Sequence, residues 1–177
     1  PPLWLRPPDF DTLILTILEQ QVSLAAARSA YNKLVQKIEL ITPGKLLTLS
    51  DEELHACYFS RQKIRYARIL ATEISEGRLN LEELNKLPEK KIRSRLIQLK
   101  GIGHWTIDMY VLMSLQFADI FPPGDLATIK AVFELKLLPE GTSKNEIVEY
   151  INRFKPYRSA ATYMLWHYYL EQRNLQL

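Results

Sequence analysis

The stretch L-K-G-I-G-H-W-T, residues 99–106, decides how this chain is organised. Two glycines flank an isoleucine between two segments of helical patterning, and F-P-P-G-D-L, residues 121–126, follows roughly twenty residues later. Glycine allows positive φ and close backbone approach, so Gly101 and Gly103 predict a tight reversal between two helices. The first amides of the second helix lack intrahelical acceptors, and an anion such as phosphate suits them. A glycine pair alone is more often a simple turn.

Apolar residues recur at helical spacing along the rest of the chain, without strand-like alternation longer than a few residues. Asp9, Ser23 and Ser60 stand where helix caps are needed. We predict an all-α fold of about ten helices: a two-lobed helical bundle with a helix-hairpin-helix motif and a cleft between the lobes. The expected helices cover residues 10–20, 24–38, 43–47, 61–74, 81–87, 88–99, 105–117, 125–137, 143–154 and 157–173, with a short one after Ser50.

The 177 residues fit a single domain over 1–177. Within it we expect a central lobe with the hairpin at 24–117 and a terminal lobe made of 1–23 plus 118–177. The proline-rich start, residues 1–8, predicts an extended arm, in which Trp4 is either docked on the body or left from a lost segment.

Composition narrows the function classes. Hydrophobic residues make up 47% and charged residues 24%, which is typical of a globular protein, and the single Cys57 excludes an intrachain disulfide framework or a multi-cysteine metal site. We expect no membrane association, because no apolar run reaches spanning length.

Net charge is +3, but residues 61–100 hold 11 Lys or Arg against 5 Asp or Glu. Solvated helix faces explain such a run most simply; nucleic acid is the partner that it suits.

Four pieces occur in order: E-Q-Q-V-S at 19–23, S-R-Q-K at 60–63, and the stretches at 99–106 and 121–126. Together they resemble the helix-hairpin-helix DNA glycosylase superfamily, and within it the 3-methyladenine DNA glycosylase II group, over roughly residues 9–170. The resemblance implies a hydrolase that releases alkylated purines from damaged double-stranded DNA in base excision repair. It also implies a monomer without a cofactor, located wherever genomic DNA lies, in the cytoplasm and nucleoid or in the nucleus.

The resemblance places the catalytic carboxylate at Asp125 and a pocket tryptophan at Trp105. Lyase members carry a Schiff-base lysine in the slot of Trp105, so the chain is expected to be monofunctional. One carboxylate suits the chemistry, because base loss leaves an oxocarbenium-like sugar that an anion stabilises. Judged alone, Asp125 reads as a helix cap and Trp105 as a core residue. Asp108 and Asp119 are the rivals for the catalytic role.

Further pocket residues are expected at Met109, Tyr110 and Gln20. Met109 stands where some members have a tyrosine, so the sequence does not decide which side chain forms the stacking surface of the pocket. Gln20 fits a hydrogen bond between a helix and a linker equally well. The wedge that fills the gap after base flipping is expected near Ser60 or Arg61, whereas Tyr58 and Phe59 are as readily core residues. DNA contacts are expected at Gly101, Ile102, Gly103, His104, Thr106, Ser60, Arg61 and Lys63.

The resemblance further implies a K⁺ or Na⁺ ion at the carbonyls of Ile97, Leu99 and Ile102 when DNA is bound. A side-chain metal site is not expected, because His55, His104 and His167 lie far apart in the sequence. Three other functions stay open: a non-catalytic helix-hairpin-helix module that grips DNA, a glycosylase for deaminated or oxidised bases, and a bifunctional lyase acting through Lys100 or Lys130.

Overall fold

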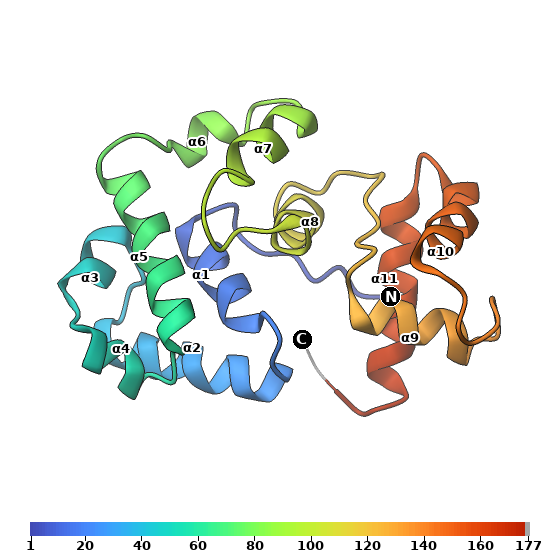
Figure 1. Cartoon of the computed structure of the whole chain (residues 1–177), viewed down its shortest axis with the longest axis horizontal. Coiled ribbons are helices and arrows are strands. Elements are labelled where there is room, and N and C mark those ends of the chain that lie inside the picture. The colour runs from blue at the N-terminus through green and yellow to red at the C-terminus, as the bar shows by residue number, and fades with distance from the viewer. Residues whose placement is uncertain (176–177) are drawn as a thin grey trace. The chain divides into compact units, whose positions relative to one another are not determined.

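The computed structural model describes residues 1–175, and in that range every regular element is a helix (Figure 1). The all-α prediction is confirmed; the cleft between lobes stays a prediction. The helices are α1 Phe10–Glu19, α2 Leu24–Ile38, α3 Pro43–Thr48, α4 Asp51–Ala56, α5 Arg61–Ser75, α6 Leu81–Leu84, α7 Glu89–Leu96, α8 His104–Met113, α9 Leu126–Glu134, α10 Lys144–Ile151 and α11 Arg158–Glu171, with the 3₁₀ turn η1 at Asn152–Phe154.

The chain divides into two compact units. The first, here called the hairpin unit, is Arg6–Tyr110; the second, the terminal unit, combines Pro1–Leu5 with the chain from Val111 onward. This division differs from the expected sub-lobes in the place of α1 and in that of residues 111–117, which belong to the terminal unit. The apolar face of α1 packs against α2 and α5, and these contacts hold it in the hairpin unit.

The predicted caps begin their helices. Asp9 accepts a hydrogen bond from the Thr12 amide at 2.9 Å. The hydroxyl of Ser23 accepts from Ala26 in the same way, and that of Ser60 accepts from Lys63. Each side chain satisfies an amide that the first helical turn leaves without a partner. Local chemistry therefore sets where these helices start.

Several helices end earlier than their apolar patterns predict. The helix expected over 81–87 ends at Leu84, and the one expected over 125–137 ends at Glu134. Lys136 adopts φ +54°, a left-handed conformation that stops α9. Of the apolar residues beyond it, Leu138 packs against the core of the terminal unit, whereas Leu137 is exposed.

Helix α1 is the centre of the hairpin unit. Leu13, Ile14 and Ile17 are completely buried, with Leu18 beside them. Its contacts with α2 on one side and α5 on the other explain why apolar residues occupy most of its circumference. The helix holds its C-terminal end, at Gln20, in a fixed position.

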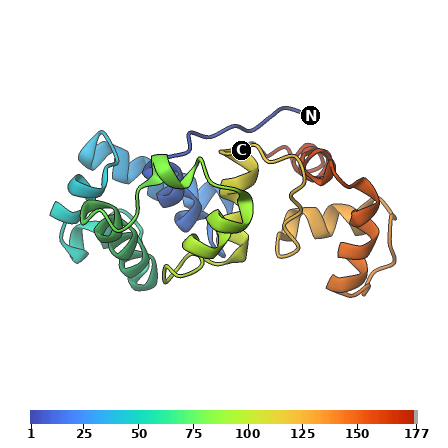
Figure 2. The same cartoon turned by 90° about the horizontal axis from the view of Figure 1, so that it is seen from above.

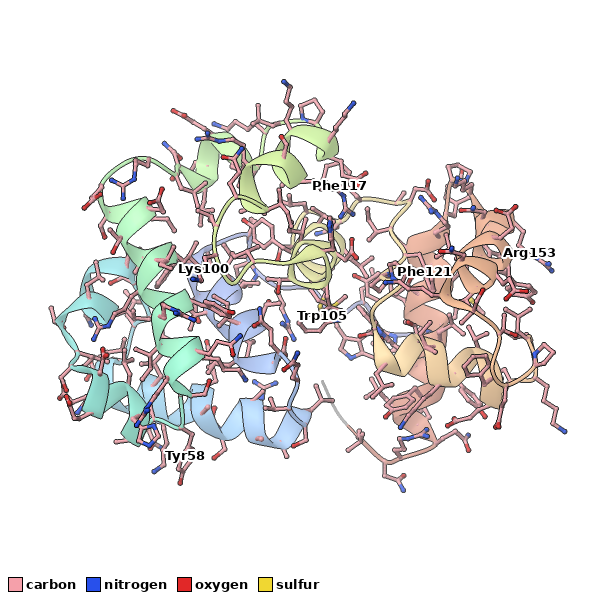
Figure 3. All side chains as sticks on the ribbon, viewed as in Figure 1. Tyr58, Lys100, Trp105, Phe117, Phe121 and Arg153 are labelled. Carbon is pink, nitrogen blue, oxygen red and sulfur yellow. The ribbon has the colours of Figure 1, made fainter. Side chains whose placement is uncertain are left out.

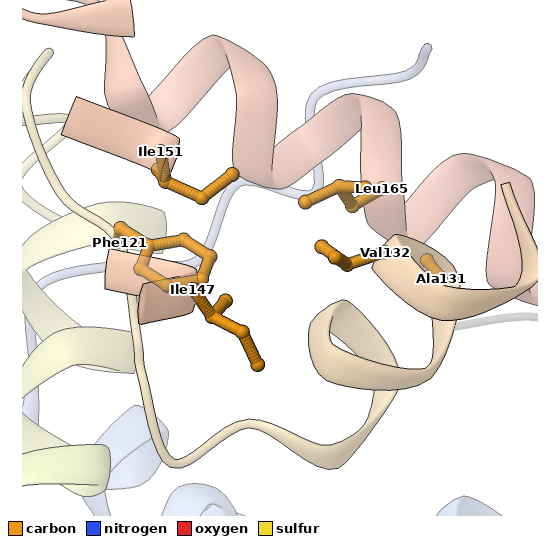
Figure 4. Close-up of a cluster of buried hydrophobic side chains, with 6 residues drawn as sticks. All are labelled: Phe121, Ala131, Val132, Ile147, Ile151 and Leu165. Carbon is orange, nitrogen blue, oxygen red and sulfur yellow. The ribbon is translucent and has the colours of Figure 1, made fainter. Parts of the chain in front are cut away.

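The terminal unit has its own core between α9, α10 and α11 (Figure 4). The N-terminal arm joins this unit, since the Trp4 ring centroid lies 6.0 Å from that of Tyr163 and 6.3 Å from that of Trp166 (Figure 2 shows its extended course). The docked alternative for Trp4 is therefore the observed one. Among residues 1–175, no helix is both long and apolar enough to cross a membrane. The core residues are Phe121, Ala131, Val132, Ile147, Ile151 and Leu165.

Candidate functional site

The two hairpin glycines have different reasons to be glycine. Gly101 has φ +100°, and a Cβ there would lie 2.1 Å from Cγ and 2.6 Å from Cβ of Tyr66 on α5. Both conformation and space therefore exclude a side chain. Gly103 has no such constraint: its φ is not positive, and no atom lies within 4 Å of the place of a Cβ. Its exposed backbone leaves room for something outside the chain to approach.

Gln20 supports the hairpin from α1. Its side-chain Nε2 donates to the carbonyl of Gly101 at 2.8 Å and to the hydroxyl of Thr106 at 2.9 Å. The structure therefore shows Gln20 in the helix-linker hydrogen bond, and both bonds of its amide nitrogen go to residues of the hairpin unit. Thr106 is 1% exposed, so its hydroxyl is not available for the phosphate contact that we expected.

A half-buried ion pair joins α7 to α8, the two helices of the hairpin. Arg93 Nη1 lies 2.7 Å from Oδ1 of Asp108, whose residue is 4% exposed, and Arg93 also contacts Glu89. Burial raises the pKa of the Asp108 carboxyl, and the guanidinium opposes that shift. Asp108 is engaged in holding the hairpin together, which argues against a catalytic role.

Asp119, the other rival carboxylate, is also engaged. Arg158 grips it with two nitrogens, at 2.7 Å from Oδ1 and 3.0 Å from Oδ2. This hydrogen bonding lowers the pKa of the Asp119 carboxyl. The pair ties the loop before α9 to the start of α11.

The helix after the hairpin buries most of the expected pocket residues. Met109 is 5% exposed and Tyr110 is completely buried, with its hydroxyl donating to Oδ1 of Asn85 at 2.8 Å. Trp105 is partly exposed in the first turn of α8, and His104 before it is exposed. Lys100 and Trp105 come from the loop and from the first turn of α8 (Figure 3). Of the expected pocket set, Trp105 alone presents a partly accessible ring.

Tyr110 gives the hairpin unit a pH-dependent stability. Burial raises the pKa of its hydroxyl from 10.0 to about 12. Between these values the folded state retains a proton that the unfolded state has lost, so the free energy of unfolding falls as pH rises from 10 to 12, by on the order of 2–3 kcal/mol. Urea unfolding at pH 9.5 and 11.5 measures the fall. Tyr110→Phe should reduce it, and an unchanged fall in that variant would contradict the assignment.

The turn before α5 separates the remaining candidates. The Ser60 hydroxyl caps α5. The Lys63 ammonium donates to the carbonyl of Leu18 at 2.6 Å, and burial lowers the pKa of this ammonium. Lys63 thus lies inward on the end of α1, not outward on DNA as we expected. Arg61 is exposed. Phe59 is 1% exposed and belongs to the core.

Tyr58, the residue before Phe59, is in contrast 58% exposed (labelled in Figure 3). It adopts φ +65°, and the ammonium of Lys33 lies 4.1 Å from the centre of its ring. The two aromatic residues of this turn therefore have opposite surroundings.

Asp125 caps α9 and is 9% exposed. One oxygen, Oδ1, accepts both the Thr128 amide and the indole Nε1 of Trp166 from α11, each at 2.9 Å. The preceding Pro-Pro-Gly closes a turn in which the Asp125 amide donates to the carbonyl of Pro122 at 3.0 Å. These contacts hold one carboxylate in one orientation at a helix N-terminus, where the helix dipole favours an anion.

Trp166 was missed in the sequence. It lies 41 residues after Asp125, on a helix that carries several other aromatic residues, and nothing in the sequence distinguishes it from them. Trp166 is 4% exposed, and a buried indole N–H needs a hydrogen-bond acceptor. The sequence does not indicate which residue supplies that acceptor.

The sequence of this chain is similar to those of known DNA repair proteins. The model of the HhH-GPD superfamily of base excision DNA repair proteins matches residues 14–156. DNA-3-methyladenine glycosylase 1 of Schizosaccharomyces pombe is 29% identical over 161 residues, 89% of this chain and 71% of that protein. DNA-3-methyladenine glycosylase of Bacillus subtilis is 28% identical over 169 residues, 89% of this chain and 56% of that protein.

Solved structures agree. The S. pombe 3-methyladenine DNA glycosylase in complex with abasic DNA superposes with a TM-score of 0.85 at 28% identity, over 94% of this chain and 83% of that one. The Archaeoglobus fulgidus 3-methyladenine DNA glycosylase gives 0.77 at 28% identity, over 90% and 57%. These matches confirm the resemblance, and the chain belongs to the HhH-GPD superfamily of base excision DNA repair proteins.

Proposed function

We propose that this chain is a monofunctional DNA glycosylase that hydrolyses the N-glycosidic bond of alkylated purines, of the 3-methyladenine type, in duplex DNA. The observation that carries the proposal is the Asp125 carboxylate, held by Thr128 and Trp166 in a member of a base excision repair superfamily. Relatives named 3-methyladenine glycosylases support the substrate class.

The chemistry follows from the carboxylate. A base stacked in a duplex hides its glycosidic carbon, so the nucleotide must first leave the stack. Departure of the base leaves positive charge at the anomeric carbon, which the Asp125 anion stabilises, and the same group orients or deprotonates the attacking water. A base alkylated at a ring nitrogen is cationic and leaves readily, so no separate general acid is needed. The aromatic face of Trp105 favours such a cation over a neutral base.

The hairpin supplies the grip on the DNA backbone. Gly103 leaves space for a phosphate beside the first amides of α8. The carbonyls of Ile97 and Ile102 accept no hydrogen bond from the rest of residues 1–175, so their oxygens fit a hard monovalent cation, with Leu99 beside them. When bound, K⁺ or Na⁺ there would add positive charge next to a phosphate.

The chain is proposed to act as a monomer on genomic DNA. The test is the release of methylated purine from alkylated duplex DNA by the wild type, with borohydride trapping run alongside. We expect base release without a trapped adduct. An adduct through Lys100 or Lys130 would favour the bifunctional lyase. Tight DNA binding without release would favour the non-catalytic module, and release of only deaminated or oxidised bases from a lesion panel would change the substrate class.

Trp166→Phe tests how Asp125 is held. Phenylalanine keeps the aromatic packing beside Trp4 and Tyr163 but removes the N–H that orients Oδ1. We expect base release to slow by about tenfold, the worth of one hydrogen bond to a charged group. Single-turnover assays measure the rate. In an Asp125→Asn background, Trp166→Phe should slow base release little further, because both substitutions act through the Asp125 carboxylate. Rate losses that add up in the double variant would show that the two residues have separate roles.

A further inference from the structure

A pocket of about 440 Å³ runs along one face of α5, and all of its lining residues belong to the hairpin unit. Arg61, Arg65 and Arg68 line it on successive turns of the helix, with Ile64 and Ile69 as apolar walls. Residues three and four apart share a helix face, so three guanidinium groups are gathered along one stripe.

The acidic residues of this pocket are already neutralised. Asp51 is bonded to Arg68 through Nε at 2.8 Å, and another nitrogen of Arg68 donates to the carbonyl of Leu49 at 2.7 Å. Glu73 is paired with Arg78 at 2.8 Å. Arg68 is consequently fixed in place as one wall, and its charge is compensated.

Arg61 and Arg65 are left uncompensated. Both are exposed, and within residues 1–175 neither forms an ion pair or a side-chain hydrogen bond. Like charges four residues apart destabilise a helix, so their pairing here has a cost that an anionic ligand would remove. Guanidinium groups match phosphate oxygens in geometry as well as charge.

The neighbouring stripe of α5 touches the hairpin. Tyr66, directly after Arg65, is the residue against which Gly101 packs. Tyr66 lies about 100° around α5 from Arg65, so the arginine stripe borders the face that touches the hairpin. A duplex held at the hairpin carries a phosphate at every base step of each strand, and we infer that its backbone continues past this border to the stripe. DNA is for this reason the occupant that the position favours over an acidic protein segment.

We propose that Arg61 and Arg65 form a second phosphate-binding site for the DNA backbone, on α5 and separate from the hairpin. The inference rests on the proposed function, because it takes duplex DNA as the ligand. The site carries no sequence information; it adds affinity and fixes the orientation of the duplex on the hairpin unit.

The salt dependence of binding tests the site. Affinity for an undamaged duplex is measured between roughly 50 and 200 mM salt, where each phosphate contact contributes about 0.9 to the slope of log K against log salt. Arg65→Gln should lower the slope by about one and weaken binding severalfold at the lowest salt. Arg61→Gln, Arg65→Gln together should lower it by about two. Lys144→Gln, an exposed lysine on α10 in the terminal unit, is the matched control and should change neither.

A second variant tests the opposite sign. Asp51→Asn releases Arg68, and we expect a steeper slope and tighter binding. Unchanged slopes in the Arg65→Gln and double variants, with circular dichroism spectra like that of the wild type, would overturn the site and leave the stripe to an acidic protein segment. Base release by the wild type is measured in parallel. An absence of base release would overturn the proposed function, whereas the slopes would still show whether Arg61 and Arg65 bind the DNA backbone.

Discussion

Asp125→Asn should slow base release sharply while leaving the fold and DNA binding intact. Asparagine is isosteric, caps helices as well as aspartate, and offers the same oxygen to the Thr128 amide and the Trp166 indole. What it lacks is the negative charge beside the anomeric carbon. We expect the rate of methylated-purine release to fall by at least about 100-fold, the usual cost of removing one electrostatic group from a transition state.

The interpretation depends on two further measurements. The free energy of unfolding should stay within about 1 kcal/mol of the wild type, as expected for an exchange of one good cap for another. Affinity for an abasic duplex should change little, because the hairpin is untouched. Wild-type rates of release by Asp125→Asn would remove this residue from the mechanism.

Gly101→Ala should have the largest effect on stability. A side chain at φ +100° is strained, at roughly 1–3 kcal/mol, and the new Cβ meets the first atoms of the Tyr66 side chain, which cannot swing away from α5. Overpacking of this kind costs a further ~1–3 kcal/mol. We expect urea unfolding to show a loss of about 2–6 kcal/mol, together with weaker DNA binding.

Gly103→Ala is the matched control for Gly101→Ala. An alanine there meets no atom within 4 Å and needs no positive φ, so stability should change by less than about 1 kcal/mol. Duplex binding should nevertheless weaken about tenfold, because the methyl group takes the space of an approaching phosphate. Normal binding by this variant would place the phosphate elsewhere. Adding Tyr66→Ala to Gly101→Ala should recover part of the stability, which a double-mutant cycle measures.

Features set by nearby residues were predictable from the sequence. The caps at Asp9, Ser23 and Ser60 depend on an amide three residues away, so their spacing was sufficient to find them. The all-helical fold follows from apolar periodicity in the same way. The position of Asp125 at the start of a helix was equally local, and its proposed chemistry came from the resemblance.

Features set by distant partners were not predictable. The inward course of Lys63 depends on a free carbonyl at the end of α1, and the support of Asp125 by Trp166 depends on how α11 packs. The two glycines look alike in G-I-G, yet Tyr66 constrains only the first. Periodicity reports which face of a helix is buried, not which side chain lies opposite.

The Gln20 amide donates both to the loop, at Gly101, and to the first turn of α8, at Thr106, from a residue 81 positions before Gly101. A synthetic peptide of the two hairpin helices would lose this crosslink, together with Tyr66 and the body of α1. Such a fragment would have to organise its loop on contact with DNA and would bind more weakly for that reason. In this protein the motif is not a portable module: its shape is supplied by the helices around it before any nucleic acid arrives.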